Sequence, residues 1–459
     1  MKKLVFIGAG SIVFTKRLLN DLFSYYPELK DTFTIRLVDI DNEKLQVATK
    51  MAQMIKKEKG SKSEIEAYKE LTPALKDATY VINTVQIGGK KAVYTDFDIP
   101  EKYGLKQTIA DTHGIGGIMR FLRTVPFFKE LINTMEKECP NALLLNFTNP
   151  MSMCMWYINS VSEIKNIGLC HSIPATLELI SAYIKTPLND IDYEVAGINH
   201  MAWVLKLEKN GKDLYPLLLK TMEDENVWEN DPVRFEILRR FSYFVTESSE
   251  HNAEYVSYFI KDQKLIKKLK IPIRETINRL ELNEKIYQTY KKYYLEGDES
   301  MKDKDEQMKA EYFGKKMSTP VKNDQINTPE ENKPHEYAMQ IINAIEEKKD
   351  VEFYGIVPNH SMITNLPYDC EVEIPCIADR NGIHPTYVGE LPSQLATLNI
   401  SQISTQRLAV RAALTGKKEY VYYAMLLDPL ASSVLSMDEI NNMTKELINA
   451  NASYLNYLS

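Results

Sequence analysis

The chain has 459 residues, 44% of them hydrophobic, which is enough material for two packed cores. Its 63 acidic residues slightly outnumber its 56 basic residues, and the charges are evenly spread, so the composition argues against nucleic-acid and membrane partners. Five cysteines form an odd set without a dense framework, which suits free thiols in a reducing cytoplasm. We therefore expect a cytoplasmic, two-domain protein.

The first part of the chain, up to about residue 175, alternates short β-branched runs with longer amphipathic stretches. This alternation is typical of βαβ units that build a parallel sheet. The opening run is interpreted as a first strand and not as a signal peptide, because its apolar stretch ends at Gly8. The predicted strands are 3–8, 34–39, 79–85, 107–111, 141–147 and 166–172.

Beyond residue 175 the pattern changes to mixed strands, such as 193–200 and 202–215, with helices such as 232–244. The expected fold class is α/β: a Rossmann-like, doubly wound parallel sheet over residues 1–175, and a mixed α+β domain over 176–459 that closes the site and mediates oligomerisation. Residues 297–336 are strongly charged and poor in large apolar residues, so we expect an exposed connector without a catalytic role, with a solvated helix face and its loop as the alternative.

A dinucleotide-binding pattern follows the first strand. In "FIGAGSIVF", Gly8 and Gly10 stand between a strand and a helix, where the backbone can approach a pyrophosphate, although Val13 replaces the usual third glycine. Asp39 ends the second strand and is expected to bind ribose hydroxyls, which favours NAD over NADP. A tight turn before a capped helix is the alternative. The predicted cofactor-binding residues are Gly8, Gly10, Ser11, Asp39, Asn83 and Thr84.

Polar residues also follow later strands, at the sheet edge where ligands bind in open α/β sheets. Asp111 precedes a glycine-rich segment, and Asn146 and Asn149 lie just before Pro150, where amide groups are suited to hydroxyl recognition. Ordinary turn chemistry is the alternative for both segments.

Cys170 and His171 end the sixth predicted strand, and His200 ends a strand of the second half. Taken singly, such residues are more often buried core groups than ligands. At a shared ligand edge, however, a thiolate and an imidazole suit a borderline divalent ion with open positions for substrate oxygens.

These motifs together resemble one family from end to end. They are "FIGAGS", "ADTHGIGGIMR", "NFTNPMSM", "GLCHSIPA", "AGINHMAW", "SYFVTESSEHNAEY" and "NGIHPTYVGELP". The chain resembles the NAD- and manganese-dependent family 4 glycoside hydrolases, most closely their melibiase-type α-galactosidases, which do not use the usual pair of carboxylates. Val13, and Ile115 where relatives often have proline, depart from the family pattern.

The resemblance implies hydrolysis through transient oxidation. Hydride leaves C3 of the sugar for NAD⁺, a base removes the acidified C2 proton, and the glycosidic oxygen is eliminated. Water then adds to the unsaturated intermediate and the hydride returns, so no net oxidant is consumed.

The resemblance also assigns roles to individual residues. Cys170 and His200 would hold Mn²⁺, or another divalent metal, against the sugar hydroxyls. His171 would act as the leaving-group acid or its surrogate. Asn149 would hold the substrate, and Asp111 would tune the base.

The identity of the base stays open among three residues of "TESSEHNAEY", namely Tyr255, Glu247 and Glu250. We favour Tyr255, because a tyrosinate beside a divalent ion is accessible. The alternative for each of them is a purely structural role, in a hydrogen-bond network between the two domains.

The expected substrate is an α-galactoside, because the Cys170-His171-Ser172 triplet resembles the galactoside-cleaving branch. Galacturonide-cleaving relatives share the triplet, so an α-galacturonidase or another α-glycosidase of the family is the alternative. A dehydrogenase of the lactate or malate type and a non-catalytic NAD-binding sensor are two further classes. Relatives generally form dimers or tetramers, and we expect a homodimer or homotetramer.

Overall fold

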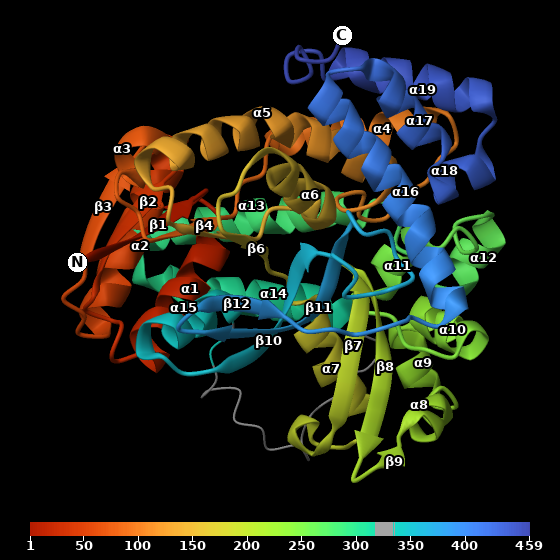
Figure 1. Ribbon diagram of the computed structural model, residues 1–459, viewed down its shortest axis with the longest axis horizontal. Coiled ribbons are helices and arrows are strands. Elements are labelled where there is room, and N and C mark those ends of the chain that lie inside the picture. Colours follow the sequence, from red (N-terminus) through yellow and green to blue (C-terminus); the bar gives the residue numbers. More distant parts are fainter. Residues whose placement is uncertain (317–333, 335) are drawn as a thin grey trace.

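The computed structural model describes residues 1–316, 334 and 336–459, and its arrangement is drawn in Figure 1. Twelve strands of this described part form one sheet. The strands are β1 (Lys2–Ile7), β2 (Phe33–Val38), β3 (Glu64–Tyr68), β4 (Tyr80–Asn83), β5 (Leu143–Asn146), β6 (Asn166–Gly168), β7 (Asp192–Ile198), β8 (Met201–Lys209), β9 (Lys212–Asp213), β10 (Val351–Pro358), β11 (Glu371–Asp379) and β12 (Gly382–Pro385).

Helices connect and cover these strands. In the first part they are α1 (Ile12–Tyr25), α2 (Asn42–Glu58), α3 (Leu71–Leu75), α4 (Gly89–Lys102), α5 (Gly114–Glu138), α6 (Met151–Val161) and α7 (Ser172–Tyr183). Later helices are α8 (Tyr215–Thr221), α9 (Glu225–Asn230), α10 (Pro232–Phe241), α11 (Ser249–Tyr255), α12 (Gln263–Lys268), α13 (Glu275–Tyr294), α14 (Lys304–Lys316), α15 (Tyr337–Glu347), α16 (Ser393–Thr415), α17 (Lys418–Leu426), α18 (Pro429–Val434) and α19 (Met437–Ala450), with 3-10 turns η1 (Leu188–Asp190) and η2 (Glu299–Met301).

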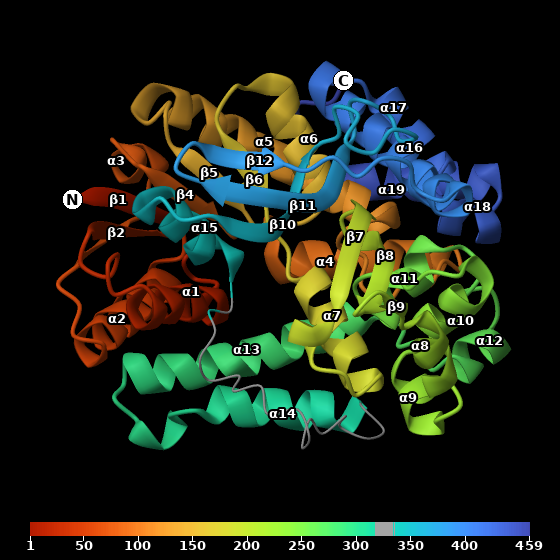
Figure 2. The same cartoon turned by 60° about the horizontal axis from the view of Figure 1, so that its bottom comes forward.

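The first half of the sheet has the strand order of a dinucleotide-binding fold. Its order is β3-β2-β1-β4-β5-β6, and every neighbouring pair is parallel. All residues of β2 and β4 are buried, as expected for parallel strands covered on both faces. Figure 2 shows α1 and α2 on one face of these strands and α5 on the other. The predicted Rossmann-like α/β fold class is confirmed.

Two strand predictions were wrong. Residues 107–111 form no strand, because their backbone N–H groups are bound by a side chain of α11 and not by a neighbouring strand. The edge strand β3 was missed, because its sequence EIEAY is short, has a single β-branched residue and contains no fully buried residue.

The sheet continues without interruption beyond residue 175. Strand β10 pairs antiparallel with β6, where Ile356 lies opposite Gly168, and β11, β7, β8 and β9 follow in that order. A Cβ at Gly168 would lie 2.9 Å from the Cβ of Ile356, so glycine permits this close junction. The predicted boundary therefore marks a change of strand direction within one sheet, and the division into domains at residue 175 stays a prediction.

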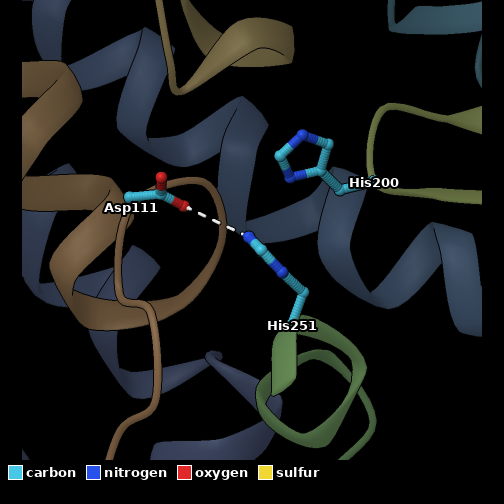
Figure 3. Close-up of side chains that lie close together, drawn as sticks. All are labelled: Asp111, His200 and His251. Carbon is cyan, nitrogen blue, oxygen red and sulfur yellow. Dashed lines mark ion pairs between the residues drawn. The ribbon is translucent and has the colours of Figure 1, made fainter. Parts of the chain in front are cut away.

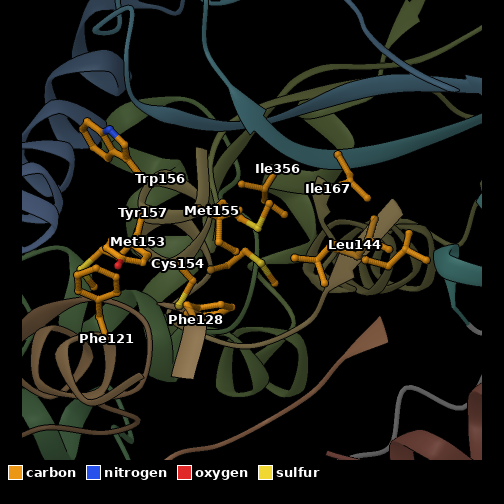
Figure 4. Close-up of a cluster of buried hydrophobic side chains, with 14 of the residues drawn as sticks. Phe121, Phe128, Leu144, Met153, Cys154, Met155, Trp156, Tyr157, Ile167 and Ile356 are labelled. Carbon is orange, nitrogen blue, oxygen red and sulfur yellow. The ribbon is translucent and has the colours of Figure 1, made fainter. Parts of the chain in front are cut away.

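A methionine-rich core supports the junction (Figure 4). Helix α6 is almost entirely buried, and its Met153, Cys154 and Met155 belong to the same hydrophobic cluster as Phe121 of α5 and Ile356 of β10. Burying each such side chain contributes about 1.5–3 kcal/mol to folding. Since α6 begins directly after Pro150, this core also fixes the turn that carries Asn149.

Most described residues of the charged segment 297–336 are exposed, as predicted, and the segment includes helix α14, which matches the alternative of a solvated helix face. Helix α14 lies beside α13 in Figure 2, and its Asp305 is buried and accepts a hydrogen bond from Tyr290. Glu336 is also buried. Residues 317–333 and 335 lie outside the described residues. None of the described helices is long and apolar enough to cross a membrane.

Candidate active site

The turn after β1 is shaped to admit a dinucleotide. Gly8 has a φ of +80° and donates its N–H to the carbonyl of Val38 at 2.9 Å. Gly10 donates its N–H to the Asp39 carboxylate at 2.8 Å, and a Cβ at Gly10 would lie only 2.5 Å from that oxygen. The two predicted glycines thus let the backbone pass close to the end of β2, where Asp39 is held in place.

Neighbouring groups complete the same turn. Thr84 donates its hydroxyl to the carbonyls of Ile7 and Gly8 at 3.1 Å, at the point between β1 and β4 where the strand order reverses. Ser11 begins α1 and is exposed, and no described side chain caps this helix. The free N–H groups and dipole of α1 therefore fit a pyrophosphate.

Asn83, the last residue of β4, lies next to Asn146, the last residue of β5. Asn83 donates Nδ2 to Oδ1 of Asn146 at 2.8 Å and to Oγ1 of Thr148 at 3.1 Å, and both asparagines are 0% exposed. Asn146 in turn donates to the carbonyl of Thr148 at 3.2 Å. Their side chains bind each other and the turn before α6, so direct contacts with cofactor or substrate stay a prediction.

Asn149 is linked to Asp111 through a residue that the sequence did not single out, Arg120. Arg120 Nε donates to the carbonyl of Asn149 at 3.1 Å, and its Nη1 lies 3.7 Å from Oδ2 of Asp111. The Asn149–Pro150 peptide bond is cis. Oδ1 of Asn149 is buried without a hydrogen-bond partner among the described residues, as expected for an atom that awaits a ligand.

Cys170 and His200 form the centre of the site. Cys170 follows β6, His200 occupies the turn between β7 and β8, and Sγ lies 3.3 Å from Nε2. Glu247 joins them, with Oε2 3.7 Å from the same Nε2, and one ligand atom of each residue lies within 4.8 Å of the others. A thiolate, an imidazole and a carboxylate form a donor set for a borderline divalent metal.

A second group shares His200, as Figure 3 shows. Asp111, from the loop before α5, lies 4.0 Å from Nε2 of His251 on α11, and the rings of His200 and His251 are 5.1 Å apart. Nδ1 of His251 lies 3.2 Å from Glu247. His251 was not predicted, although its spacing of four residues from Glu247 in "TESSEH" was an available signal.

The charges of this cluster stabilise one another. Burial opposes ionisation of Cys170, but His200 outweighs it and lowers the pKa of the thiol to about 7. Burial likewise raises the pKa of Glu247, but His251 and His200 outweigh it and bring that pKa to about 2. For Asp111, Arg120 and His251 overcome burial and lower the pKa. The thiolate and carboxylate forms that bind metals are therefore favoured. Burial disfavours the imidazolium of His200, but Glu247 and Cys170 outweigh it and raise the pKa of His200 to about 10, so a metal would have to displace its proton.

His171 belongs to neither of the two metal-type groups and is half-exposed, although its charge acts on Cys170 and Glu247. Its Nδ1 lies 3.2 Å from Glu336, and its ring centroid lies 6.1 Å from that of Phe14 on α1. Burial disfavours the imidazolium, but the hydrogen bond and charge of Glu336 outweigh it and raise the pKa of His171 to about 9. At neutral pH the ring carries a proton that it can donate.

The three candidate bases are placed differently. The buried Tyr255 has its hydroxyl 3.4 Å from Nδ1 of His200, and Glu247 contacts both histidines. Glu250 points toward Arg279 of α13, at 4.0 Å. Burial, followed by the charge of Asp111, raises the pKa of Tyr255 well above its usual 10. Tyr255 and Glu247 thus lie in the cluster, and Glu250 lies toward its rim.

A dinucleotide-type turn and a thiolate–imidazole–carboxylate cluster that could hold a metal ion are the features of a nucleotide-dependent α/β enzyme. Within this class the family is clear. Residues 3–186 match the model of the family 4 glycosyl hydrolases, and residues 195–431 match that of the family 4 glycosyl hydrolase C-terminal domain. The chain belongs to glycosyl hydrolase family 4, as the sequence motifs predicted.

Curated relatives match the whole length. The chain is 41% identical to an α-galactosidase of Bacillus subtilis (strain 168), over 99% of both chains. It is 30% identical to an α-galactosidase of Rhizobium meliloti (strain 1021), over 99% of this chain and 89% of the relative. An α-galacturonidase of Thermoanaerobacterium saccharolyticum is 26% identical, over 98% and 96%.

Solved structures share the fold. A putative glucosidase, lplD, of Bacillus subtilis superimposes with a TM-score of 0.79 at 23% identity, over 97% of this chain and 99% of its own. A 6-phospho-β-glucosidase of Thermotoga maritima, solved with manganese, NAD⁺ and glucose-6-phosphate, gives a TM-score of 0.75 at 22% identity, over 98% and 99%.

Proposed function

We propose that this protein is an α-galactosidase that hydrolyses terminal α-D-galactosides with the aid of NAD⁺ and a divalent cation such as Mn²⁺. The observation that carries the proposal is the joint placement of the Gly8–Asp39 turn and the Cys170–His200–Glu247 set at one edge of the sheet. The identity of 41% with an α-galactosidase over the full length supports the choice of sugar.

The cofactors fit the residues present. Bound together, NAD⁺ and the cation supply reversible hydride acceptance and polarisation of sugar oxygens. Gly8 and Gly10 clear the space for the dinucleotide, and Asp39 is positioned for ribose hydroxyls. Cys170 and His200 hold the cation, and Glu247 is placed as an additional ligand. The free Oδ1 of Asn149 accepts a hydrogen bond from a substrate hydroxyl, and Asn146 supports its turn.

Two residues handle the protons. His171, kept protonated beside Glu336, donates to the departing glycosidic oxygen. Tyr255 is placed to take the proton from C2 of the sugar; burial and the charge of Asp111 raise the pKa of its hydroxyl well above 10, so a bound cation would have to lower that pKa. Glu247 is a poor alternative as a base, because a carboxylate with a pKa near 2 binds protons weakly. Asp111 faces His251 and Arg120 and adjusts the charge around Tyr255.

The alternative substrate is an α-galacturonide. Its support is the relative of 26% identity and the Cys170-His171-Ser172 triplet. A galacturonide adds a carboxylate at C5 of the sugar, which would require an additional cationic group in the site.

A panel of nitrophenyl glycosides tests the choice of sugar. The α-galactoside, α-galacturonide and α-glucoside are compared with NAD⁺, Mn²⁺ and a reductant present. We expect kcat/KM for the α-galactoside to exceed the others by at least about tenfold, equivalent to about 1.4 kcal/mol of differential transition-state binding. A preference for the galacturonide would replace the proposal by its alternative. The homodimer or homotetramer and the cytoplasmic location stay predictions, which sedimentation and cell fractionation address.

A further inference from the structure

Glu254 is a buried carboxylate of α11 that takes no part in the proposed chemistry. It is 6% exposed and accepts hydrogen bonds from three consecutive backbone N–H groups. These belong to Thr108, to Ile109 at 3.0 Å, and to Ala110 at 3.0 Å. Burial raises the pKa of Glu254 to about 7 against these N–H groups, and the three hydrogen bonds satisfy a carboxyl group that is removed from water.

The segment that Glu254 binds depends on this arrangement. It belongs to no strand, and its carbonyls are bound by residues just before and within α13: Arg274 N–H donates to Gln107 at 2.8 Å, and the Thr276 hydroxyl donates to Ile109 at 2.6 Å. Ala110 has a φ of +52°, a left-handed conformation that alanine rarely adopts. Such a backbone persists only where its surroundings hold it.

Asp111 follows Ala110 directly, and Tyr255 follows Glu254 directly. The Glu254 carboxylate, together with the hydrogen bond that the Thr108 hydroxyl donates to the carbonyl of Glu250 at 2.6 Å, thus ties the loop that carries Asp111 to the helix that carries His251 and Tyr255. We infer that Glu254 is a positioning residue, which rests on the proposed function: it sets the separation between the Asp111 carboxylate and the proton-handling groups of α11. It acts through Asp111 and does not contact the reacting atoms itself.

Glu254→Gln tests the hydrogen bonds of this side chain without changing its size. It preserves the volume and the burial, but it replaces one acceptor oxygen by an amide N–H₂. With its oxygen in the Oε1 position, the Ala110 N–H loses its bond to Oε2 at 3.0 Å, faces the amide donor, and keeps only the longer bond to Oε1 at 3.2 Å. Glu371 provides a matched control: it is 1% exposed, lies on β11 and accepts from Asn159 at 2.9 Å, away from the Asp111 loop.

The test is a double-mutant cycle with Asp111. In the otherwise unchanged enzyme, Glu254→Gln is expected to lower kcat about ten- to a hundredfold, with KM and NAD⁺ affinity within about twofold. In an Asp111→Asn background it is expected to cost less than about twofold, because the group that it positions is already lost. Glu371→Gln leaves kcat unchanged in both backgrounds. An equal fold-loss from Glu254→Gln in both backgrounds, or an equal loss from Glu371→Gln, overturns the inference.

A substrate-free measurement separates this inference from the choice of sugar. Amide hydrogen exchange of the peptide that spans 107–113 is expected to accelerate at least about tenfold in Glu254→Gln and not in Glu371→Gln. Unchanged exchange contradicts the inference whatever the enzyme hydrolyses, whereas faster exchange in an enzyme inactive on galactosides contradicts only the proposed function. If Glu254→Gln fails to fold, Glu254→Asp, which keeps both acceptors on a shorter stem, serves in the same cycle.

Discussion

Sγ of Cys170 lies 3.3 Å from Nε2 of His200, although the two residues come from the end of β6 and from the turn between β7 and β8. His200 has a φ of +63°, and the preceding Asn199 donates its side-chain amide to the buried Glu373 at 3.3 Å. A strained two-residue turn thus presents an imidazole to a thiol on the dinucleotide half of the sheet. This contact joins the two halves of the chain into one site.

Substitution of Cys170 or His200 is expected to remove cation binding without affecting the binding of the dinucleotide. Cys170→Ser and His200→Ala each lose a ligand, so Mn²⁺ affinity is expected to fall at least about 100-fold and hydrolysis with it. NAD⁺ affinity, measured by fluorescence titration, stays within about twofold because neither side chain lies in the Gly8–Asp39 turn. His384→Ala, at an exposed histidine beside Asp379, is the control. Equal, mild losses in all three variants would contradict the metal assignment.

Cys170 is expected to be the first thiol that iodoacetamide alkylates. Its pKa of about 7 yields thiolate at neutral pH, whereas burial raises the pKa of Cys139 to about 11 and that of Cys376 to about 12. Cys154 and Cys370 are buried and shifted further in the same direction. Peptide mapping after brief alkylation, with and without Mn²⁺, measures the order. Mn²⁺ is expected to protect Cys170, and an unprotected Cys170 argues against ligation.

Tyr255→Phe is expected to lower kcat about 100-fold or more, because it removes the hydroxyl beside His200 that takes the C2 proton. Glu250→Gln is expected to cost less than about tenfold, since Glu250 lies toward Arg279. Steady-state kinetics of the two variants decide between the assignments. A larger loss in Glu250→Gln would move the base to that residue.

Gly10→Ala is expected to weaken NAD⁺ binding by at least about tenfold, or about 1.4 kcal/mol. The new Cβ would lie 2.5 Å from the Asp39 carboxylate and must displace it from its ribose-binding position. Isothermal titration with NAD⁺ measures the change, and Mn²⁺ affinity is expected to be retained. Undiminished NAD⁺ affinity would show that Asp39 does not contact the cofactor.

The alternation of apolar runs was sufficient to predict five of the six parallel strands, because β1, β2, β4, β5 and β6 are short and mostly buried, whereas β3 was missed. Residues 107–111 have the same local pattern, but their backbone binds Glu254, Arg274 and Thr276, which are distant in the sequence, and not a neighbouring strand. A single sequence contains no signal for those contacts.

The site residues, too, could be predicted only where a local sequence pattern marks them. Cys170, His200 and Asp111 stand next to strands or turns in recognisable motifs and could be predicted. Arg120 and Glu336 could not, since each contributes through a contact with one of these motifs that exists only in the folded chain.

Hydrolysis of nitrophenyl α-galactoside in D₂O, with NAD⁺, Mn²⁺ and a reductant, distinguishes elimination from direct displacement. We expect released galactose with deuterium at C2, detected by NMR, and no net NADH. Galactose released without deuterium at C2 would indicate direct displacement at the anomeric carbon and contradict the oxidation and elimination route.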